Sequence, residues 1–590
     1  MEKVLDALNA KIIAANKHQD LFLKYKTLCT DEDRIMFTLN VMLEYNIVPQ
    51  VCDNKKDAKE SEKLREQGNK IFISTPLKNY TCVEALKLYT KSIAYAPYPS
   101  EQLALAYANR SAVLIKLRKY ELCIQDIDRT LALAYPNNLR AKLYIRKVEC
   151  LNALKNPNIE DTIKEAQYWL EKMSLDNKKK LNEKLKSIKN MLPSQKFKKE
   201  KFMKQAPLPK IKTHNIEVPC ASDAITIKYN DKYEVSWANI PCEHCTYAMY
   251  CSEECKAMEW KKYHDIECAI FPSMLKMNFV KLDLFSLRLA IQAVREATSI
   301  QELRKELEEV DSCEDPRTKG FSKNGMFLSD KYRSLLGLIT NTEKRSVQDL
   351  FRRSLDASFI LYFLATCSNM FGSPLKKDLS ILIKNDNVIF VGGLILRHQQ
   401  LIPSNIHSFS EECGLDAVER GIAAMPFFSL INHSCNPNIL RHSRSNYMII
   451  YVIFPIQKGE QLYDNYGQHY AITPKEERQK ELLKQYYFKC NCLACQENWP
   501  LYYNLKSFKS LIKKKEDENK INHVLRKFNN YVDIATEGNI SDKHIVDDLL
   551  KMIEVLYDLV PMPCEEMNNV VETLKRVYDL NGNRFEIPDF

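Results

Sequence analysis

The chain has 590 residues, of which 45% are hydrophobic and 27% are charged, and its formal net charge is +10. This composition is typical of a soluble globular protein, and the length predicts three or four domains. No apolar run approaches the roughly 18 residues of a membrane span, and the first residues lack the apolar region of a secretory signal. We therefore expect the 19 cysteines to be reduced thiols, in cytoplasm and nucleus. Basic residues do not alternate with aromatic ones, so nothing indicates direct nucleic-acid binding.

The N-terminal third is helical in pattern. Residues 1–60 predict two or three polar helices. Residues 61–193 predict three helix pairs that repeat at about 38 residues, close to the roughly 34 of a tetratricopeptide repeat. The lysine-rich stretch from Lys178 to Lys212 is either a solvated helix end with a linker or a signal for an acidic partner or nuclear import. Its prolines place a linker at 194–218.

Five polar residues of the predicted repeats could line one groove, because residues four apart share a helix face. They are Arg65, Asn69, Asn109, Lys142 and Arg146. This set resembles the carboxylate clamp of repeat domains that bind the C-terminal Glu-Glu-Val-Asp of Hsp90 and Hsp70, since basic and amide groups suit terminal carboxylates. Alternatively they are solvated surface residues, the asparagines being ordinary repeat consensus.

Residues 241–270 carry cysteines and histidine at metal-ligand spacing. The set is Cys242, Cys245, Cys251, Cys255, His264 and Cys268. It resembles a MYND zinc finger. The resemblance implies that Cys242, Cys245, His264 and Cys268 form a complete zinc site, whereas Cys251 and Cys255 lack their usual upstream pair, with only Cys220 nearby. Six unligated core residues are the alternative, but so short a segment has too few large apolar residues to fold without metal.

The second half of the chain mixes patterns. Residues 271–375 look helical. Short strands are expected at Val388–Val391 and at Tyr447–Phe454, and helices are expected from Cys495 to about Tyr578. The predicted fold class is therefore α+β and multidomain, with a helical repeat solenoid, a zinc finger inserted in a β-rich domain, and a C-terminal helical domain.

The most informative motifs lie between residues 432 and 495. Asn432-His433-Ser434-Cys435 is followed by Asp464-Asn465-Tyr466-Gly467 and then by three further cysteines, Cys490, Cys492 and Cys495. Cys435 and these three can supply four thiolates, which make a closed tetrahedral zinc site. Such a site would hold the segment after Tyr466 against the Asn-His turn.

Together these features resemble the SET and MYND domain family of protein-lysine methyltransferases, specifically the larger kind with N-terminal repeats. The resemblance divides the rest of the chain into a remnant of the first SET strands (219–240), the zinc finger (241–270), a SET domain with a helical insert (271–480), a post-SET zinc segment (481–496) and a C-terminal helical domain (497–590). It implies S-adenosylmethionine and zinc as cofactors, and a lysine side chain of a protein as substrate.

Site residues follow from the same resemblance. Asn405, Asn432, His433, Tyr466 and Phe488 match cofactor-binding positions. Tyr466 and Tyr486 match the catalytic tyrosine and a wall of the lysine channel. The channel suits the chemistry, because desolvation disfavours the ammonium form of lysine and methyl transfer needs the neutral amine.

One family feature is missing. The family begins with a Gly-x-Gly strand that closes over the cofactor, but no two of the 13 glycines here are separated by one residue. The matching opening runs to Tyr233 and then jumps to Pro241, so a single deletion would remove both that strand and the first zinc pair. Two functions therefore stand: a protein-lysine methyltransferase, or a catalytically impaired adaptor that binds other proteins through its repeats, MYND finger and C-terminal helices.

Overall fold

The computed structural model describes residues 1–53, 55–73, 78–173, 175–190, 216–218, 239–413, 416–444, 447–538, 540 and 542–582. They form two compact units: one from residues 1–49, 216–218 and 277–582, the other from residues 50–190 and 239–276. Helices dominate both units, and the strands of the described segments form four small sheets. None of the described helices has the length and apolar character that crossing a membrane requires.

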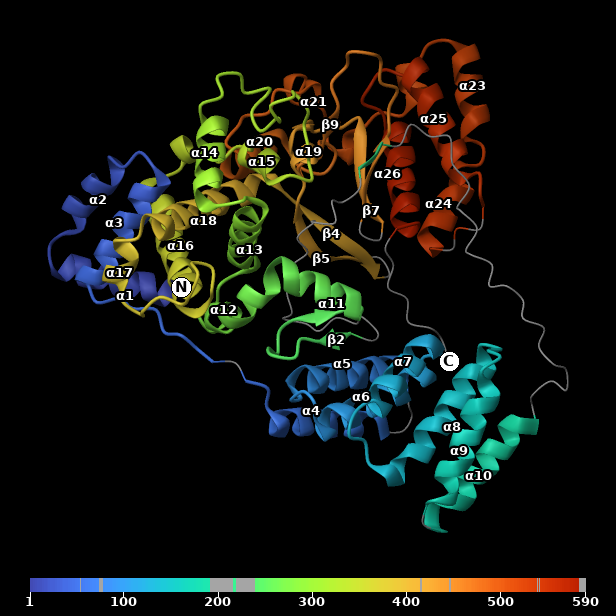
Figure 1. The fold of residues 1–590 in the computed structure, drawn as a ribbon. Coiled ribbons are helices and arrows are strands. Elements are labelled where there is room, and N and C mark those ends of the chain that lie inside the picture. Colours follow the sequence, from blue (N-terminus) through green and yellow to red (C-terminus); the bar gives the residue numbers. More distant parts are fainter. Residues whose placement is uncertain are drawn as a thin grey trace. The chain divides into compact units, whose positions relative to one another are not determined.

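The second unit begins with a helical array (Figure 1). Its helices are α4 (Ala58–Ile73), α5 (Asn79–Tyr95), α6 (Glu101–Lys116), α7 (Tyr120–Leu131), α8 (Asn137–Ala153), α9 (Ile159–Glu171) and α10 (Leu175–Asn190). Sequential helices pack in pairs, α4 on α5, α6 on α7 and α8 on α9. Gly68 allows the first pair to approach closely, because a Cβ there would lie 2.6 Å from the Tyr89 ring.

The segment predicted to be a zinc finger belongs to the same unit. It comprises β2 (Ile240–Pro241), β3 (Met249–Tyr250), α11 (Glu253–Glu259), the π-helical turn η1 (Trp260–His264) and α12 (Asp265–Lys276). Strands β2 and β3 pair antiparallel. Ser252 begins α11, because its hydroxyl accepts a hydrogen bond from the Cys255 amide. A hairpin followed by a helix brings the two halves of the ligand set together.

Helices make up the first part of the other unit. They are α1 (Glu2–Ala14), α2 (His18–Lys26), α3 (Asp31–Glu44), α13 (Lys281–Glu296), α14 (Ile300–Asp311), α15 (Tyr332–Leu336), the 3-10 turn η2 (Thr342–Lys344), α16 (Val347–Cys367), α17 (Leu379–Ile383) and α18 (Asp386–Asn405). Helix α3 packs on α16 and α18. Gln400 Nε2 on α18 donates to Asp31 on α3 at 3.0 Å, and the hydroxyl of Tyr25 on α2 meets the Ser354 hydroxyl on α16 at 2.5 Å. The N-terminal helices therefore cover the helical insert.

The strand expected at Val388–Val391 is wrong, since these residues lie in α18. Asn385 begins this helix by accepting a hydrogen bond from the Val388 amide. Most of α18 is buried against α3, α13 and α16. A helix buried on nearly all sides is apolar all round, so its short apolar run has no visible 3.6-residue period.

The strands of this unit frame the predicted site. They are β1 (Ile216–Val218), β4 (Ile406–Cys413), β5 (Asp416–Ala424), β6 (Asn432–His433), β7 (Ile439–Arg444), β8 (Tyr447–Val452) and β9 (Tyr463–Asp464). One sheet has the order β1-β8-β7, β4 and β5 form a hairpin, and β6 pairs with β9 in parallel. The short helix α19 (Pro426–Ser429) precedes β6. Strand β8 lies where Tyr447–Phe454 was expected to be extended.

Strand β1 pairs antiparallel with β8, with Ile216 opposite Ile450. It lies at the end of the predicted linker 194–218, so the sheet begins earlier in the chain than the sequence indicated. The rest of that linker, and residues 219–238 of the predicted strand remnant with Cys220, lie outside the described residues.

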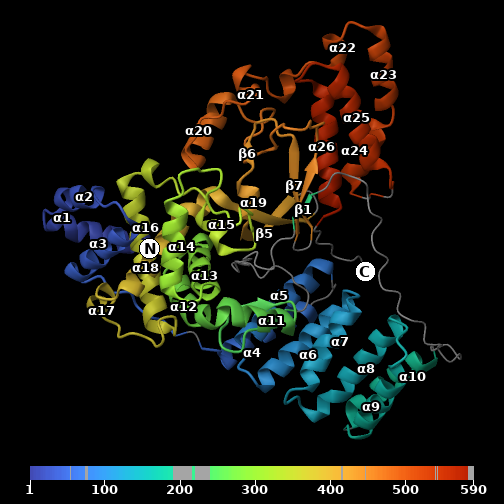
Figure 2. The same ribbon diagram turned by 45° about the horizontal axis from the view of Figure 1, so that its top comes forward.

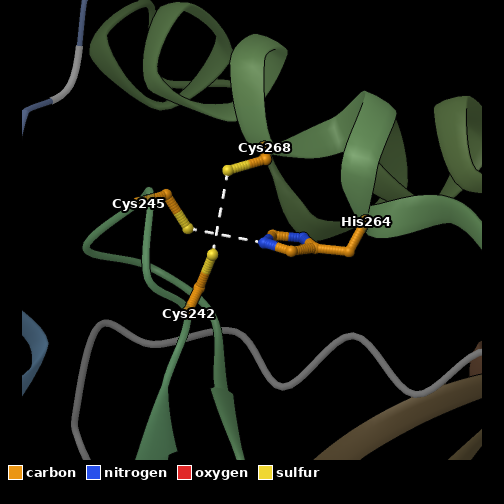
Figure 3. Close-up of side chains that lie close together, drawn as sticks. All are labelled: Cys242, Cys245, His264 and Cys268. Atoms are coloured by element: carbon orange, nitrogen blue, oxygen red, sulfur yellow. Dashed lines mark hydrogen bonds between the residues drawn. The ribbon is translucent and has the colours of Figure 1, made fainter. Parts of the chain in front are cut away.

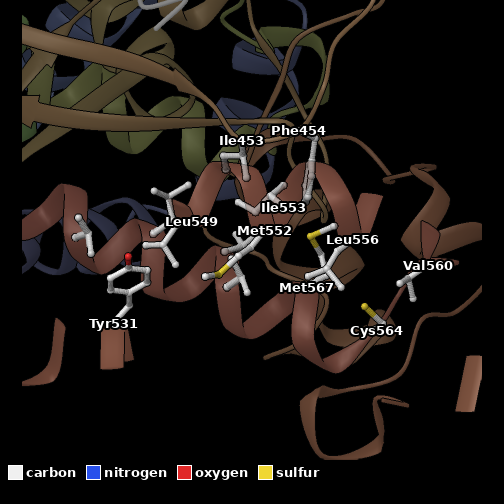
Figure 4. Close-up of a cluster of buried hydrophobic side chains, with 14 of the residues drawn as sticks. Ile453, Phe454, Tyr531, Leu549, Met552, Ile553, Leu556, Val560, Cys564 and Met567 are labelled. Carbon is white, nitrogen blue, oxygen red and sulfur yellow. The ribbon is translucent and has the colours of Figure 1, made fainter. Parts of the chain in front are cut away.

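The C-terminal part of the unit is helical. Its elements are α20 (Lys475–Tyr486), α21 (Leu493–Gln496), the 3-10 turn η3 (Tyr502–Asn504), α22 (Phe508–Leu511), α23 (Lys515–Leu525), α24 (Phe528–Glu537), α25 (Ile545–Leu559) and α26 (Glu565–Leu580). Ile453 and Phe454, which follow β8, pack into the core of these helices (Figure 4). Helix α26 also lies beside β7 (Figure 2). The sheet and the C-terminal helices thus share one core.

Candidate functional site

Two chain segments meet at the parallel pair of β6 and β9, where His433 lies opposite Asp464. The Tyr466 amide donates to His433 Nδ1 at 3.0 Å, and the Tyr466 hydroxyl donates to the Ile431 carbonyl at 2.6 Å. Asn465 Nδ2 donates to the Ser434 carbonyl at 3.0 Å. These three bonds hold the Asn-His turn and the Asn-Tyr turn against each other.

The turn after Tyr466 depends on Gly467, whose φ of +94° is strained for residues with a Cβ. Asn465 Oδ1 accepts from the Gly467 amide at 2.8 Å, an Asx-turn that reverses the chain. The Asn-Tyr-Gly spacing is therefore a local device that aims the Tyr466 ring back toward His433.

Four rings gather at this point. The Tyr466 ring lies 4.8 Å from Tyr486 and 5.2 Å from His433, and Phe488 lies 6.1 Å from His433 and 6.4 Å from Tyr466 between ring centres. Burial raises the pKa of Tyr466 to about 12 and also raises the pKa of Tyr486. Both hydroxyls therefore stay protonated at neutral pH.

His433 connects this aromatic cluster to the cysteines. Its Nδ1 accepts a hydrogen bond from an amide, so the ring proton must sit on Nε2, which lies 3.4 Å from the Cys435 sulfur. Burial lowers the pKa of His433 to about 4, which favours this neutral form. The imidazole thus bridges the tyrosine turn and a predicted metal ligand.

The four predicted thiolates of the second metal site meet in the structure. The sulfurs of Cys435, Cys490, Cys492 and Cys495 all lie within 4.8 Å of one another. Cys435 Sγ is 3.9 Å from Cys490 Sγ and 3.5 Å from Cys495 Sγ. Two sulfurs on one tetrahedral zinc at about 2.3 Å would lie roughly 3.8 Å apart. The residues therefore fit a structural zinc ion.

Arg478 on α20 contacts two of the four cysteines of this set, Cys435 and Cys495, and it was not predicted from the sequence. Its side chain is fully buried, and its Nε donates to Cys435 Sγ at 3.2 Å while Nη2 faces Cys495 Sγ at 3.6 Å. Nη1 donates to the Thr473 carbonyl at 2.5 Å. Its helix is otherwise strongly polar, so nothing in the pattern separates Arg478 from its surface neighbours.

The first metal set also meets, in the other unit (Figure 3). The ligand atoms of Cys242, Cys245, His264 and Cys268 lie within 4.8 Å of one another. Cys242 Sγ is 3.9 Å from Cys268 Sγ, and Cys245 Sγ is 3.5 Å from His264 Nε2. Glu267 lies 3.7 Å from the other ring nitrogen, Nδ1. A carboxylate behind a histidine is the usual orienting partner of a zinc ligand, so this set fits zinc as well.

Cys251 and Cys255 lie near each other, with their sulfurs 3.2 Å apart. Neither belongs to the two four-residue sets found among the described residues. Their predicted role as metal ligands stays a prediction, since Cys220 lies outside the described residues.

Among the predicted cofactor residues, Asn405 and Asn432 differ in accessibility. Asn432 is exposed beside the rings. Asn405, at the end of α18, is only 3% exposed, and its Nδ2 donates to the Ile339 and Leu401 carbonyls at 2.9 and 2.8 Å. Its amide nitrogen is thus committed to the fold.

A polar cluster, in which Asp464 and His407 are buried and Arg441 is half-buried, adjoins the tyrosines. Arg441 on β7 pairs with Asp464 and lies 2.5 Å from His407 Nδ1. Charges on Arg441 and Asp464 act on both Tyr466 and Tyr486. Asp464 belongs to the Asp-Asn-Tyr-Gly motif that was identified in the sequence. Arg441 and His407 lie far from that motif in the sequence, and no pattern around them predicted a place in the site.

The five residues predicted to form a carboxylate clamp lie on α4, α6 and α8 of the helical array. Asn109 Nδ2 donates to Asn69 Oδ1 at 2.7 Å, and the Tyr89 hydroxyl donates to the same oxygen at 2.8 Å. Arg65 and Arg146 both lie close enough to act on the Tyr89 hydroxyl. Buried Arg65 Nε meets no hydrogen-bond acceptor in the described part of the chain. Lys142 is exposed one turn before Arg146.

Comparison with known proteins identifies a family and several relatives. A family model described as SET domain matches residues 40–467. Protein-lysine N-methyltransferase SMYD4 of Mus musculus is 25% identical, over 82% of this chain and 72% of that protein. The protein of the same name from Danio rerio is 24% identical, over 80% of this chain and 71% of its own. Histone-lysine N-methyltransferase SMYD3 of Mus musculus is 34% identical over 84 residues, 14% of this chain and 19% of that protein.

Proposed function

Since the chain belongs to the SET domain family, whose model covers more than half of it, we propose that it is a protein-lysine N-methyltransferase of the SET and MYND type. The observation that carries the proposal is the cluster of Tyr466, Tyr486, Phe488 and His433 at the junction of β6 and β9. S-adenosylmethionine would supply a methyl group on a sulfonium, which is transferred to the lysine amine.

The rings perform the lysine side of the reaction. A lysine amine is a nucleophile only when it is neutral, and its pKa in water is about 10.4. Half-buried rings of Tyr466 and Tyr486 exclude water, which disfavours the ammonium form. The Tyr466 hydroxyl is turned toward the Ile431 carbonyl, which fixes the ring. The faces of the same rings can also stabilise the partial positive charge on the methyl group during its transfer.

Fewer residues are available to bind the cofactor. Asn432 offers an exposed amide, His433 offers its backbone, and Phe488 offers a half-buried ring face. Asn405 can contribute its backbone or its side-chain oxygen, because its amide nitrogen is already bonded to the fold. The reduced thiolates of the two zinc sets suit the proposed compartments, cytoplasm and nucleus.

Calorimetry on the zinc-loaded chain tests cofactor binding. We expect S-adenosylmethionine to bind, and Asn432→Ala to weaken binding about tenfold, the cost of one or two lost hydrogen bonds. Asn491→Ala, at an exposed asparagine near the second cysteine set, is the matched control and should change nothing. Incorporation of labelled methyl groups into protein lysines, read by mass spectrometry, tests transfer.

The absent Gly-x-Gly strand favours a second candidate, an adaptor that no longer transfers methyl groups. The two functions separate cleanly in the same assays. A zinc-loaded chain that binds no S-adenosylmethionine and labels no lysine, while retaining its protein partners, would be the adaptor.

For the partner of the repeat array we propose an acidic C-terminal peptide such as the Glu-Glu-Val-Asp end of Hsp90 or Hsp70. Support comes from the adjacent amides of Asn69 and Asn109, from the buried Arg65 Nε, and from the exposed Lys142. Amides and cations on the neighbouring helices α4, α6 and α8 suit a terminal carboxylate with a neighbouring acidic side chain.

A further inference from the structure

The zinc finger lies against the repeat array within one compact unit. Its hairpin side chain Met249 packs on a buried cluster of α5 and α6, formed by Ile93, Ala96, Leu103, Ala106 and Tyr107. Strand β2 of the hairpin also packs against α5. A two-stranded hairpin of this size is marginal by itself, so this burial is a substantial part of its support.

A buried charge cluster reaches from the array to the finger backbone. Arg110 on α6 is fully buried and binds Asp126 through Nε and Nη2, at 2.7 and 2.9 Å. Nη2 also donates to the Asn239 carbonyl at 3.0 Å, immediately before β2. Arg110 therefore fixes the start of the hairpin, because removing one partner of a buried charge network is costly.

The connector of residues 50–57 joins the same two parts. The Cys52 amide donates to Ser273 Oγ on α12 at 2.9 Å. Lys56 Nζ donates to the Ala94 carbonyl in the last turn of α5 at 2.7 Å, where a cation is favourable. Burial lowers the pKa of Lys56, and the nearby thiols Cys245, Cys242 and Cys268 act in the opposite direction.

The position of Lys56 has an electrostatic consequence. Three thiolates and one neutral imidazole on a divalent zinc ion leave a net charge of about −1. The Lys56 ammonium is close enough to offset that charge, although it lies outside the finger and is bonded to a repeat helix. Metal binding and the end of α5 are thereby linked through one side chain.

We propose that the zinc finger is an intramolecular cap on the repeat array. Its hairpin face takes α5 and α6 of the same chain as its partner, and metal at Cys242, Cys245, His264 and Cys268 keeps that face in shape. This role is independent of methyl transfer. It also means that the hairpin face is occupied by the chain's own repeats, so other proteins would have to use a different side of the finger.

Hydrogen exchange of the full-length chain tests the cap. In Cys242→Ser, which loses the finger metal, we expect amides of α5 and α6 to exchange about tenfold faster or more, because their covered face opens. Cys490→Ser, which loses the other metal, is the matched control and should leave α5 and α6 at the wild-type rate. Unchanged exchange in Cys242→Ser would overturn the proposal.

Two variants separate the cap from general unfolding of the finger. Met249→Asp puts a charge on the packed position, whereas Met258→Asp changes an exposed position of α11. We expect only Met249→Asp to speed exchange in α5 and α6 while the finger keeps its zinc. Zinc retained with α5 and α6 as protected as in Met258→Asp would show that the hairpin face is not the contact.

The rate at which the finger releases zinc tests whether Lys56 stabilises the metal site. In a Cys490→Ser background, only the finger ion is counted. We expect Lys56→Met to speed release to a chelator, because a cation near the anionic site is lost, and Lys55→Met, at an exposed neighbour, to match the parent. Equal release from the two variants would remove Lys56 from the mechanism and contradict the proposed coupling.

Discussion

Arg478 Nε donates a hydrogen bond to Cys435 Sγ across 3.2 Å, and both side chains are completely buried. Arg478 stands on α20, 43 residues after Cys435 in the chain. Four thiolates on one zinc ion carry a net charge of about −2, which is costly to bury. The guanidinium offsets part of that charge and joins α20 to the Asn-His turn that carries the site.

Replacing Arg478 should therefore weaken zinc binding at the second set. In a Cys242→Ser background, where the first set is lost, we expect Arg478→Met to reduce zinc affinity about 10- to 100-fold in chelator competition. Lys480→Met, at an exposed position on the same helix, is the control. If Arg478→Met and Lys480→Met bind zinc equally well, the guanidinium stabilises the fold through the backbone carbonyls that it contacts and does not stabilise the bound metal.

Zinc content follows directly from the two ligand sets. Elemental analysis of the intact chain should give two zinc ions, and Cys242→Ser and Cys490→Ser should each remove one. A value near three would show that Cys251 and Cys255 bind metal with ligands beyond the described residues. A value near zero would contradict both sets.

The Tyr466 hydroxyl should matter for transfer more than for folding. In Tyr466→Phe the ring stays but its bond to the Ile431 carbonyl is lost, and we expect methyl transfer to fall about 10- to 100-fold, equivalent to roughly 1.4–2.7 kcal/mol. S-adenosylmethionine affinity and zinc content should not change. Tyr503→Phe, at a residue that is 79% exposed, is the control. Transfer at the wild-type rate would exclude a role for this hydroxyl.

The predicted clamp on the repeat array should distinguish a peptide with a free C-terminal carboxylate from one with a C-terminal amide. We expect the full chain to bind a peptide ending in Glu-Glu-Val-Asp near 1 μM, about 8 kcal/mol, and Lys142→Ala to weaken it because one carboxylate loses its cation. Lys164→Ala, at an exposed lysine on α9, is the control. Equal binding of the C-terminally amidated peptide would show that the groove is no carboxylate clamp.

His398 on α18 should make the first unit sensitive to mild acid. Its Nδ1 faces the Ser286 carbonyl at 3.2 Å, so Nδ1 carries the proton and Nε2 accepts from the Tyr332 hydroxyl. Burial lowers the pKa of His398 to about 3. The unfolded chain, with a histidine pKa of about 6.5, binds more protons between pH 6.5 and 3, so stability falls as pH falls through that window.

The expected size is about 1.4 kcal/mol lost by pH 5.5, from one histidine that protonates only when unfolded. Denaturant unfolding at pH 7.5 and 5.5 measures it. In His398→Gln this part of the pH dependence should vanish, although the variant is less stable at both values. A wild-type pH dependence retained in His398→Gln would show that the group is not neutral in the fold.

Much of the site was predictable because its signals are local. Closely spaced cysteines can bind one metal ion because a single turn of the backbone brings them together. Such spacing occurs in Cys490-x-Cys492-x-x-Cys495 and in Cys242-x-x-Cys245. The tight turn at Asn465-Tyr466-Gly467 was not predicted, although its signal is local too, since glycine is favoured at the φ of +94° that Gly467 adopts. The remote ligand Cys435 was predicted from its chemistry, as a fourth thiolate for three local ones, whereas the assignment of His264 to one zinc ion with Cys242, Cys245 and Cys268 came from the resemblance to a MYND zinc finger.

Other parts were decided by tertiary contacts. Val388–Val391 has the composition of a strand, yet burial on nearly every side makes it part of helix α18. Arg478 and Lys56 look like ordinary surface cations in sequence, and only the fold places each near a cluster of thiols. Strand β1 finds its partner β8 more than 200 residues later.

The sequence by itself determined the closely spaced cysteine ligands and most of the helices, because these depend on neighbours within a few residues. The tertiary structure alone decided which charges face the metal sets, and that the finger packs on its own repeats. The physical reason is that burial and Coulomb energy depend on the distance between groups in space. The pattern of hydrophobic residues along the chain does not indicate which distant groups come into contact.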